Sequence, residues 1–306
     1  MLLLIKYTLL YGIVLMLVAL GGMFSEHSGV INIALEGIMV VGGLAGVLVT
    51  ASMPTTMAPA LIVLAAVVAA AVCGMLYSLL LAFASINLKA DQTIGGTALN
   101  MLATAIAMIL AKNFNGSTSA KISYTNKPFL FSIGGLELSI FIPLGIVLLV
   151  VSYIVMYKTR FGLRLRACGE HPQAADSVGI NVYRMRYAGV LISGMLGGLG
   201  GIVYITAGVS EWKFENGVAG FGFLALAVMI FGQWKPTRIA LAALLFGFFR
   251  ALGNVYTGFD LLKAMNLPAA VYNMLPYIIS LIVLAFTSEK SRAPKAEGIP
   301  YDKGQR

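Results

Sequence analysis

Charge is scarce in this chain. Only 11% of its 306 residues are charged, 59% are hydrophobic, and the mean hydropathy is +0.90. A soluble domain is nearer half apolar and a quarter charged. The composition therefore excludes an ordinary soluble protein and predicts an integral membrane protein.

Residue types that carry out chemistry are also few. The two cysteines, Cys73 and Cys168, cannot build a disulfide framework or a metal cluster. The two histidines, His27 and His171, lie far apart in the sequence. The phosphate-binding pattern G-x-x-x-x-G-K-[ST] does not occur. We therefore expect no catalytic site, no metal site and no cofactor in this chain, and any ATP that drives it must be bound by another polypeptide.

The excess of basic residues does not indicate a nucleic-acid partner. The net charge is +9, but the lysines and arginines gather in loops beside apolar runs, as they do on the cytoplasmic side of membrane proteins. With residues 158–186 placed inside, fourteen of the 21 basic residues fall inside, six fall outside and Arg250 lies in a span. This count predicts a cytoplasmic C-terminus and an external N-terminus, although Lys6 opposes the latter.

Nine apolar runs approach the length of about 20 residues that a membrane-spanning helix needs. They are residues 7–24, 34–52, 58–83, 96–111, 138–157, 187–208, 218–233, 236–253 and 269–286. Several are short and rich in glycine, so we expect about eight to ten spanning helices, some of them broken or tilted. Residues 29–35 are a candidate half-helix. The first run lacks a small-x-small cleavage site, which favours an uncleaved helix over a signal peptide.

The chain is predicted to hold one transmembrane domain, residues 1–287, and a cytoplasmic tail, residues 288–306. The tail carries two prolines and mixed charge, which predicts disorder. Residues 112–137 are polar and external, and they either receive a partner or form a solvated loop. A weak likeness between the segments that start at Gly29 and Gly217 reflects either a two-fold internal repeat or chance.

Residues 157–187 form a long basic stretch between two apolar runs. Pro172 predicts the start of a short helix, because proline at the first helical position loses no hydrogen bond. Gly179 predicts its end, because glycine accepts the left-handed conformation there. The apolar residues between them are Ala174, Ala175 and Val178. A helix this short is unstable alone, and we expect another protein to dock on it.

Polar side chains inside apolar runs mark either a pathway or a structural pairing, because their burial is costly. Asn32 and Glu36 lie four residues apart on one helical face. They line a path, pin a broken helix beside it, or serve structure alone. Gln92 and Asn100 line the path or make interhelical hydrogen bonds. Asn254 is a further pathway candidate, near the outer end of a span.

Three segments resemble one protein family. NIALEGIMVVG from Asn32, DQTIGGTALN from Asp91 and TRFGLRLRACGEHPQAADSVGIN from Thr159 look like the permease subunits of bacterial ABC importers for branched-chain amino acids, simple sugars and nucleosides. The resemblance runs from about residue 7 to residue 286, and the first and third segments are most similar to the nucleoside branch. The family most often has asparagine where this chain has His171. Asparagine is the better helix cap, so the start of the short helix is expected to be less firmly held here.

The resemblance implies an all-α polytopic protein of the bacterial cell membrane that works by alternating access. It implies three protein partners: an ATP-binding cassette ATPase that binds the ATP, a second permease subunit that is often a different chain, and an external substrate-binding lipoprotein. Movement of the ATPases would push the short helix and tilt the adjoining spans. By the match, the segment that couples to the ATPase would contain Gly169, Pro172, Ala174, Ala175, Gly179 and Ile180.

Two alternatives stay open. The resemblance favours import of a nucleoside, and a sugar or branched-chain amino acid permease of the same family is the runner-up, because the pathway residues are too apolar to distinguish the substrates. A secondary transporter driven by an ion gradient would use Glu36 as a proton site. That second alternative leaves the short capped helix without a role.

Overall fold

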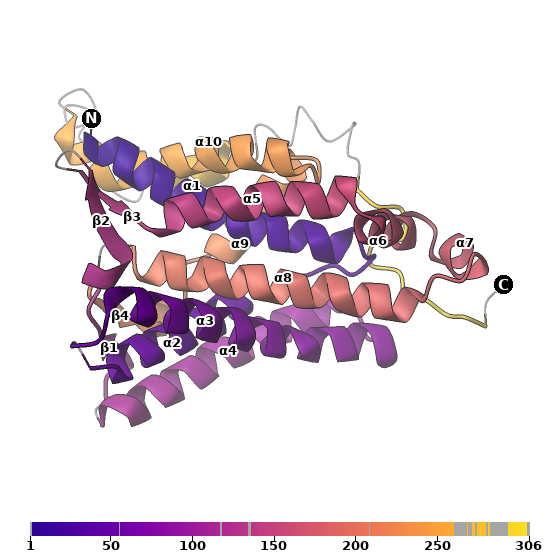
Figure 1. The fold of residues 1–306 in the computed structure, drawn as a ribbon, viewed down its shortest axis with the longest axis horizontal. Coiled ribbons are helices and arrows are strands. Elements are labelled where there is room, and N and C mark those ends of the chain that lie inside the picture. The colour runs from indigo at the N-terminus through magenta and orange to yellow at the C-terminus, as the bar shows by residue number, and fades with distance from the viewer. Residues whose placement is uncertain are drawn as a thin grey trace.

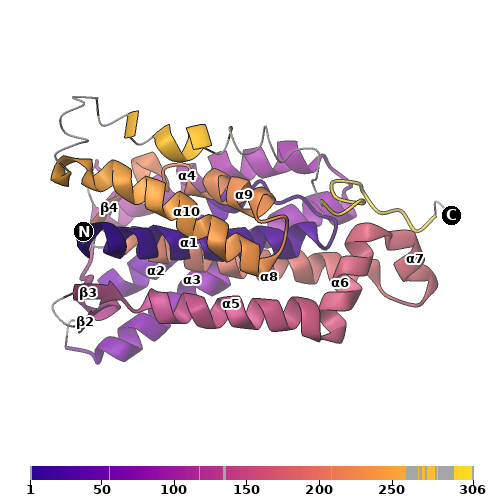
Figure 2. The same cartoon turned by 90° about the horizontal axis from the view of Figure 1, so that it is seen from above.

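Long helices lie side by side along the long axis of the molecule, with short strands at one end and two short helices at the other (Figure 1). The structure is a computed structural model that describes residues 2–54, 56–116, 118–133, 136–207, 209–259, 268, 271–272, 274–279, 281 and 293–304. The N-terminus lies at the strand end and the C-terminus at the opposite end, beyond the short helices (Figure 2). The charge count likewise predicts that the two termini lie on opposite sides of the membrane.

Seven helices among the described residues are long and apolar enough to cross a membrane. They are α1 (Leu2–Glu26), α2 (Leu35–Ser52), α3 (Pro59–Ala82) with its π-helical end η1 (Phe83–Asn87), α4 (Gln92–Asn115), α5 (Phe141–Lys158), α8 (Val182–Ile205) and α10 (Pro236–Val255) with the 3-10 turn η4 (Tyr256–Gly258). Apolar chain adopts helices in lipid because a helix satisfies its own backbone groups. The predicted all-α polytopic fold is confirmed. The run at 269–286 lies largely outside the described residues.

Two predicted elements are wrong. The 218–233 run forms only α9 (Phe221–Phe231), whose 11 residues rise about 16 Å, roughly half of a bilayer core. Gly217 and Gly220 hold positive φ angles of 54° and 79° before it, and Gln233 and Trp234 hold 51° and 54° after it, so the backbone leaves the helix at both ends. The predicted half-helix at 29–35 is instead a non-helical connection, residues 27–34, which we call the α1–α2 break.

Helix α8 packs against α1, α2 and α3, and glycines allow this close contact. A Cβ added to Gly198 would lie 2.2 Å from the Ala70 carbonyl oxygen of α3. A Cβ added to Gly42 of α2 would lie 2.3 Å from the Gly198 Cα. Small residues let membrane helices approach in this way and gain dispersion contacts. The core of the molecule therefore lies along α8.

The strand end has more structure than the solvated loop that was one prediction for residues 112–137. Two antiparallel pairs form there: β1 (Lys121–Ser123) with β4 (Glu211–Lys213), and β2 (Leu130–Ile133) with β3 (Leu136–Ser139). Two 3-10 turns lie beside them, η2 (Lys127–Phe129) and η3 (Phe214–Asn216). Ile122 and Phe129 are fully buried, and their burial orders the loop. Lys6 lies at this end in an ion pair with Glu137, at 3.5 Å.

The opposite end holds α6 (Arg160–Glu170) and α7 (Pro172–Ser177). Helix α7 confirms the predicted short helix, with proline at its start and Gly179 at φ +84° after it. His171 is the N-cap residue, and its side chain makes no capping hydrogen bond. That matches the expectation that the start of this helix is less firmly held.

The tail departs from the predicted disorder over residues 293–304, the part that the structure describes. This segment runs along the end of the bundle, and Ala296 and Tyr301 are 6% and 4% exposed. Composition predicts disorder only when a segment cannot bury apolar surface. Here Ala296 and Tyr301 are buried against the rest of the protein, which composition does not reveal.

Candidate functional site

Side chains from α4 satisfy the backbone of the α1–α2 break. The Ile31 amide donates to the Gln92 side-chain oxygen at 2.7 Å, and the Asn100 side-chain amide donates to the Ile33 carbonyl at 2.9 Å. The Asn100 side-chain oxygen also accepts from the Gly37 amide at 2.7 Å. Non-helical backbone within a membrane protein needs such partners, because lipid offers none.

Asn32 ties the same break to α8. Its side-chain amide donates to the Ser193 hydroxyl at 2.8 Å, and the residue is fully buried. Gln92 and Asn100 are also buried. Of the roles that the sequence left open, these bonds favour pinning of the broken helix for Asn32 and structural hydrogen bonding for Gln92 and Asn100. A direct contact with substrate stays a prediction.

Glu36 joins the first turns of two helices. Its carboxylate oxygens accept from the backbone N–H groups of Gly220, at 2.8 Å, and Gly222, at 2.6 Å, at the N-terminus of α9. Glu36 itself lies in the first turn of α2. A negative charge is favourable at both helix N-termini, where backbone N–H groups lack partners. A Cβ on Gly222 would lie 2.4 Å from the Glu36 backbone nitrogen, so this junction requires glycine.

The junction lies about halfway along the bundle. Helix α9 ends at a turn that is followed by Lys235 and by Arg238 in the first turn of α10, and the charge count places both residues inside. Its start, at Glu36, is about 16 Å away from that end, against a bilayer core of roughly 30 Å. Discontinuous helices whose ends meet near the midplane mark the sites of many transporters. The break and the junction are therefore the candidate hinge of this protein.

Asn254 does not belong to this network. It is exposed and donates to the hydroxyl of Tyr11. Beside it is an aromatic cluster that sequence reasoning missed: the Tyr204 and Phe221 ring centroids are 4.2 Å apart, and the Arg250 guanidinium lies 5.5 Å from the Phe221 centroid. Aromatic residues in apolar runs carry no signal of such contacts, because their partners come from distant spans.

The six predicted coupling residues differ in their exposure. Gly169, Pro172 and Ala175 are buried against their own chain, Ala174 and Gly179 are exposed, and Ile180 is partly buried. The apolar residues Ala174, Ala175 and Val178 do not form one surface, because Ala175 points inward while Val178 is 74% exposed. The face that α7 offers to a partner is therefore Ala174, Ser177 and Val178. Docking on this face stays a prediction.

Gly169 connects residues 158–186, the predicted coupling loop, to the α1–α2 break. A Cβ at Gly169 would lie 2.4 Å from the carbonyl oxygen of His27, so the end of α6 touches the start of the break without room for a side chain. The His27 ring nitrogen is 3.2 Å from the Trp234 carbonyl. Burial lowers the pKa of His27 to about 4. His27 is therefore uncharged at neutral pH, and its ring N–H donates to that carbonyl.

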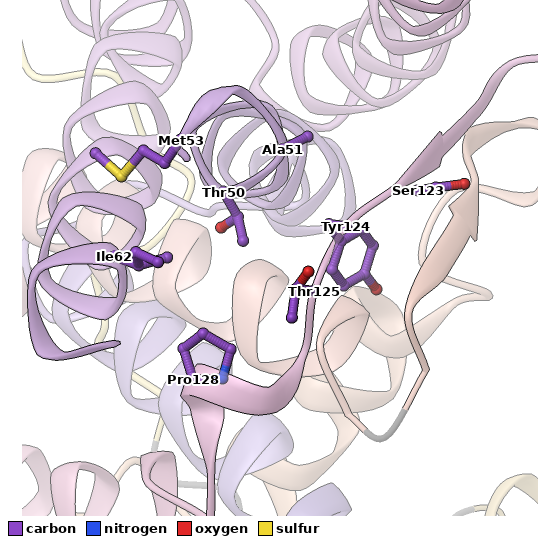
Figure 3. A pocket seen from close by; sticks show the side chains of 8 residues that line it. All are labelled: Thr50, Ala51, Met53, Ile62, Ser123, Tyr124, Thr125 and Pro128. Atoms are coloured by element: carbon purple, nitrogen blue, oxygen red, sulfur yellow. The ribbon is translucent and has the colours of Figure 1, made fainter. Parts of the chain in front are cut away.

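The strand end has a hollow of about 160 Å³ (Figure 3). It opens between the end of α2, the start of α3 and the segment that follows β1. Its lining residues are Thr50, Ala51, Met53, Ile62, Ser123, Tyr124, Thr125 and Pro128. This lining contains both hydroxyl-bearing and apolar side chains.

No group of three or more His, Cys, Asp and Glu side chains gathers among the residues that the structure describes. The arrangement described above consists of hydrogen bonds and close backbone contacts at a helix break. It can transmit movement, and it can hold or release the ends of α2 and α9.

Comparison with known proteins decides the family. Residues 4–284 match the family model described as branched-chain amino acid transport system / permease component. The chain belongs to this permease family. The resemblance inferred from the segments at Asn32, Asp91 and Thr159 is thereby confirmed, and the permease is a multi-pass protein of the cell membrane.

Curated relatives cover nearly the whole permease. It is 41% identical over 310 residues to the nucleoside ABC transporter permease protein NupC of Lactococcus lactis subsp. cremoris, covering 97% of this chain and 96% of that one. It is 42% identical over 313 residues to the guanosine ABC transporter permease protein NupQ of Bacillus subtilis, covering 98% and 96%. The putative glucose ABC transporter permease protein TsgC13 of Haloferax volcanii is 31% identical, covering 89% and 88%. No solved structure matches.

Proposed function

We propose that this permease is the membrane-spanning subunit of an ATP-driven nucleoside importer in a bacterial cell membrane. The observation that supports the substrate is its full-length similarity to a nucleoside permease and a guanosine permease, which exceeds its similarity to a putative glucose permease. The subunit moves substrate and performs no ATP hydrolysis of its own.

The partner that binds and hydrolyses ATP is an ATP-binding cassette ATPase. It docks on the exposed face of α7, where Ala174 and Val178 offer a small apolar surface. Helix α7 is six residues long and gains little stability from its own hydrogen bonds. A bound ATPase would therefore hold it firmly and could move it as a rigid piece.

Movement of α7 reaches the membrane-spanning helices in two steps. The Gly169–His27 approach carries it from α6 to the α1–α2 break. The amides of Gln92 and Asn100 then carry it to the start of α2, where Glu36 holds α9. Alternating access follows if α2 and α9 tilt together about this junction while α8 stays in place.

Two further partners complete the importer. A second permease subunit, a different chain in our proposal, shares the substrate path. An external substrate-binding lipoprotein delivers the nucleoside to the strand end, where the hollow beside Thr50 and Tyr124 accepts one of its side chains.

The test is transport by the reconstituted complex of both permeases, the ATPase and the receptor. Labelled guanosine, glucose and leucine are offered to liposomes with ATP inside or outside. We expect guanosine uptake that requires hydrolysable ATP on the α7 side. Uptake of glucose or leucine alone would assign the permease to another branch of its family. Uptake driven by a proton gradient without ATP would refute the importer and favour Glu36 as a proton site.

A further inference from the structure

Residues 293–304, which we call the C-terminal strap, contact α6, the α1–α2 break and α8. The Ala296 amide donates to the Gly169 carbonyl at the end of α6, at 2.8 Å. The Gly298 amide donates to the Gly29 carbonyl in the α1–α2 break, at 3.2 Å. Two successive turns of the strap thus bind the coupling loop and the break at the same time.

The strap also covers a buried arginine of α8. Arg186 is 1% exposed and donates to the Ile299 carbonyl at 2.9 Å. Its Nε and Nη2 atoms find no hydrogen-bond partner among the described residues. A buried donor without a partner lowers the stability of the state that buries it. The docked strap is therefore held by several contacts and at the same time opposed by this cost.

The far end of the strap packs against the inward face of α7. Tyr301 is 4% exposed and packs in a small core with Cys168, Ala175 and Val182. This core holds the inward face of α7, opposite the face proposed for the ATPase. Beyond it, Asp302 forms an ion pair with Lys89 of the turn before α4, at 2.7 Å.

A carboxyl pair lies where the strap meets α1. The carboxyl groups of Glu297 and of Glu26 on α1 interact with each other electrostatically. Burial raises the pKa of Glu297 to about 7. The indole N–H of Trp234 donates to the Glu26 carboxyl group. The backbone carbonyl of Trp234 accepts from the uncharged ring of His27. A charged group of α6, Arg166, acts on His27 and lies over the Tyr157 ring at 4.8 Å.

We propose that the C-terminal strap is a positioning element for coupling, which holds the α6–α7 loop against the α1–α2 break so that movement of α7 reaches the hinge. This role rests on the proposed function, because it requires an ATPase that moves α7. Without the strap, α7 would still be present and able to bind the ATPase through its outer face. The hydrogen bonds to Gly169 and Gly29 and the ring of Tyr301 would be missing, and α7 would move without carrying the break.

The experiment measures nucleoside transported per ATP hydrolysed in the reconstituted complex. The variants are deletion of residues 293–306 and Tyr301→Ala, with Tyr301→Phe and the exposed Lys303→Ala as matched controls. We expect the deletion and Tyr301→Ala to keep ATPase binding, to keep ATP hydrolysis within about twofold, and to lower the transport ratio about tenfold. Both controls should keep the wild-type ratio, because one retains the ring and the other changes no strap contact.

The outcomes separate the strap from the proposed function. A wild-type ratio in Tyr301→Ala, with only a lower melting temperature, would make the strap a structural element and overturn the inference. Tyr301→Ala decides the matter even where the deletion does not assemble. A wild-type complex without ATP-dependent nucleoside uptake would refute the proposed function itself, and the strap's role with it.

Discussion

The α1–α2 break and helix α7 are both short interruptions of the helix bundle, but they are held in opposite ways. Side chains from α4 and α8 satisfy the break, with hydrogen bonds of 2.7–2.9 Å from Gln92, Asn100 and Asn32. Helix α7 has an uncapped start at His171 and one exposed face. Lipid cannot solvate backbone groups, so the chain must supply every partner in the membrane. At the aqueous end, water and a partner protein can do so.

The largest expected effect on stability comes from removing hydrogen bonds to the α1–α2 break. Asn100→Leu leaves the buried Gly37 amide and the part-buried Ile33 carbonyl without partners, which costs at most about 2–6 kcal/mol at roughly 1–3 kcal/mol for each group. We expect a clearly lower melting temperature of the purified permease. Asn113→Leu, at an exposed position on the same helix, should melt like the wild type. Equal melting of the two variants would mean that the break is not held by this side chain.

The next prediction compares the two faces of α7. Ala175→Asp places a carboxylate in the small core beneath α7, at a cost of roughly 2–4 kcal/mol, and should lower the melting temperature of the permease alone. Ala174→Asp changes the exposed face, so it should leave that melting temperature unchanged and abolish ATPase binding in a pull-down. Normal ATPase binding by Ala174→Asp would refute docking on this face.

A smaller effect is expected at the junction of α2 and α9. Glu36→Gln keeps the shape but replaces one acceptor oxygen by an amide group, so one of the two N–H groups of α9 loses its partner, at about 1–3 kcal/mol. The melting temperature should fall, and Glu215→Gln, an exposed change just before α9, should not lower it. Uptake per assembled complex then separates a hinge from plain structure. A wild-type rate at a reduced melting temperature would leave Glu36 with a structural role only.

The smallest effect concerns pH at the C-terminal strap. The pKa of Glu297 is about 7 when docked and 4.5 in its unperturbed state, so docking takes up a proton between these values. Docking should therefore weaken as pH rises from about 4.5 to about 7 and stay level above it. Hydrogen exchange of the strap amides, corrected for intrinsic rates, should show less protection at pH 7.5 than at pH 5. Glu297→Gln should remove the difference, and a difference of the same size in that variant would assign it to another group.

Much of the fold could be predicted because it follows from local properties. Long apolar runs predict helices wherever water is excluded, and Pro172 and Gly179 set the ends of α7 by their own backbone preferences. Helix α9 was predicted too long for the same reason. Hydropathy continues from 218 to 233, but the positive φ angles of Gly217, Gly220 and Trp234 end the helix, and hydropathy does not report them.

The candidate site was only partly predictable. Asn32, Glu36, Gln92 and Asn100 were identified because polar groups in apolar runs are costly. Their partners were not, because the Ile31–Gln92 bond joins residues 61 positions apart and the Glu36–Gly220 bond joins residues 184 positions apart. Gly169 was assigned to ATPase docking from a motif, whereas its packed neighbour in the structure is His27.

The sequence by itself determined the membrane class, the all-α fold, the short helix between Pro172 and Gly179, and the family, because composition, local backbone preference and motif can be recognised without the three-dimensional structure. Only the tertiary structure decided which face of α7 is free, that Glu36 caps α9, and that the tail docks as a strap on Arg186 and Gly169. These are contacts between distant segments. Their energies depend on which groups lose water together, and that is settled only when the helices pack.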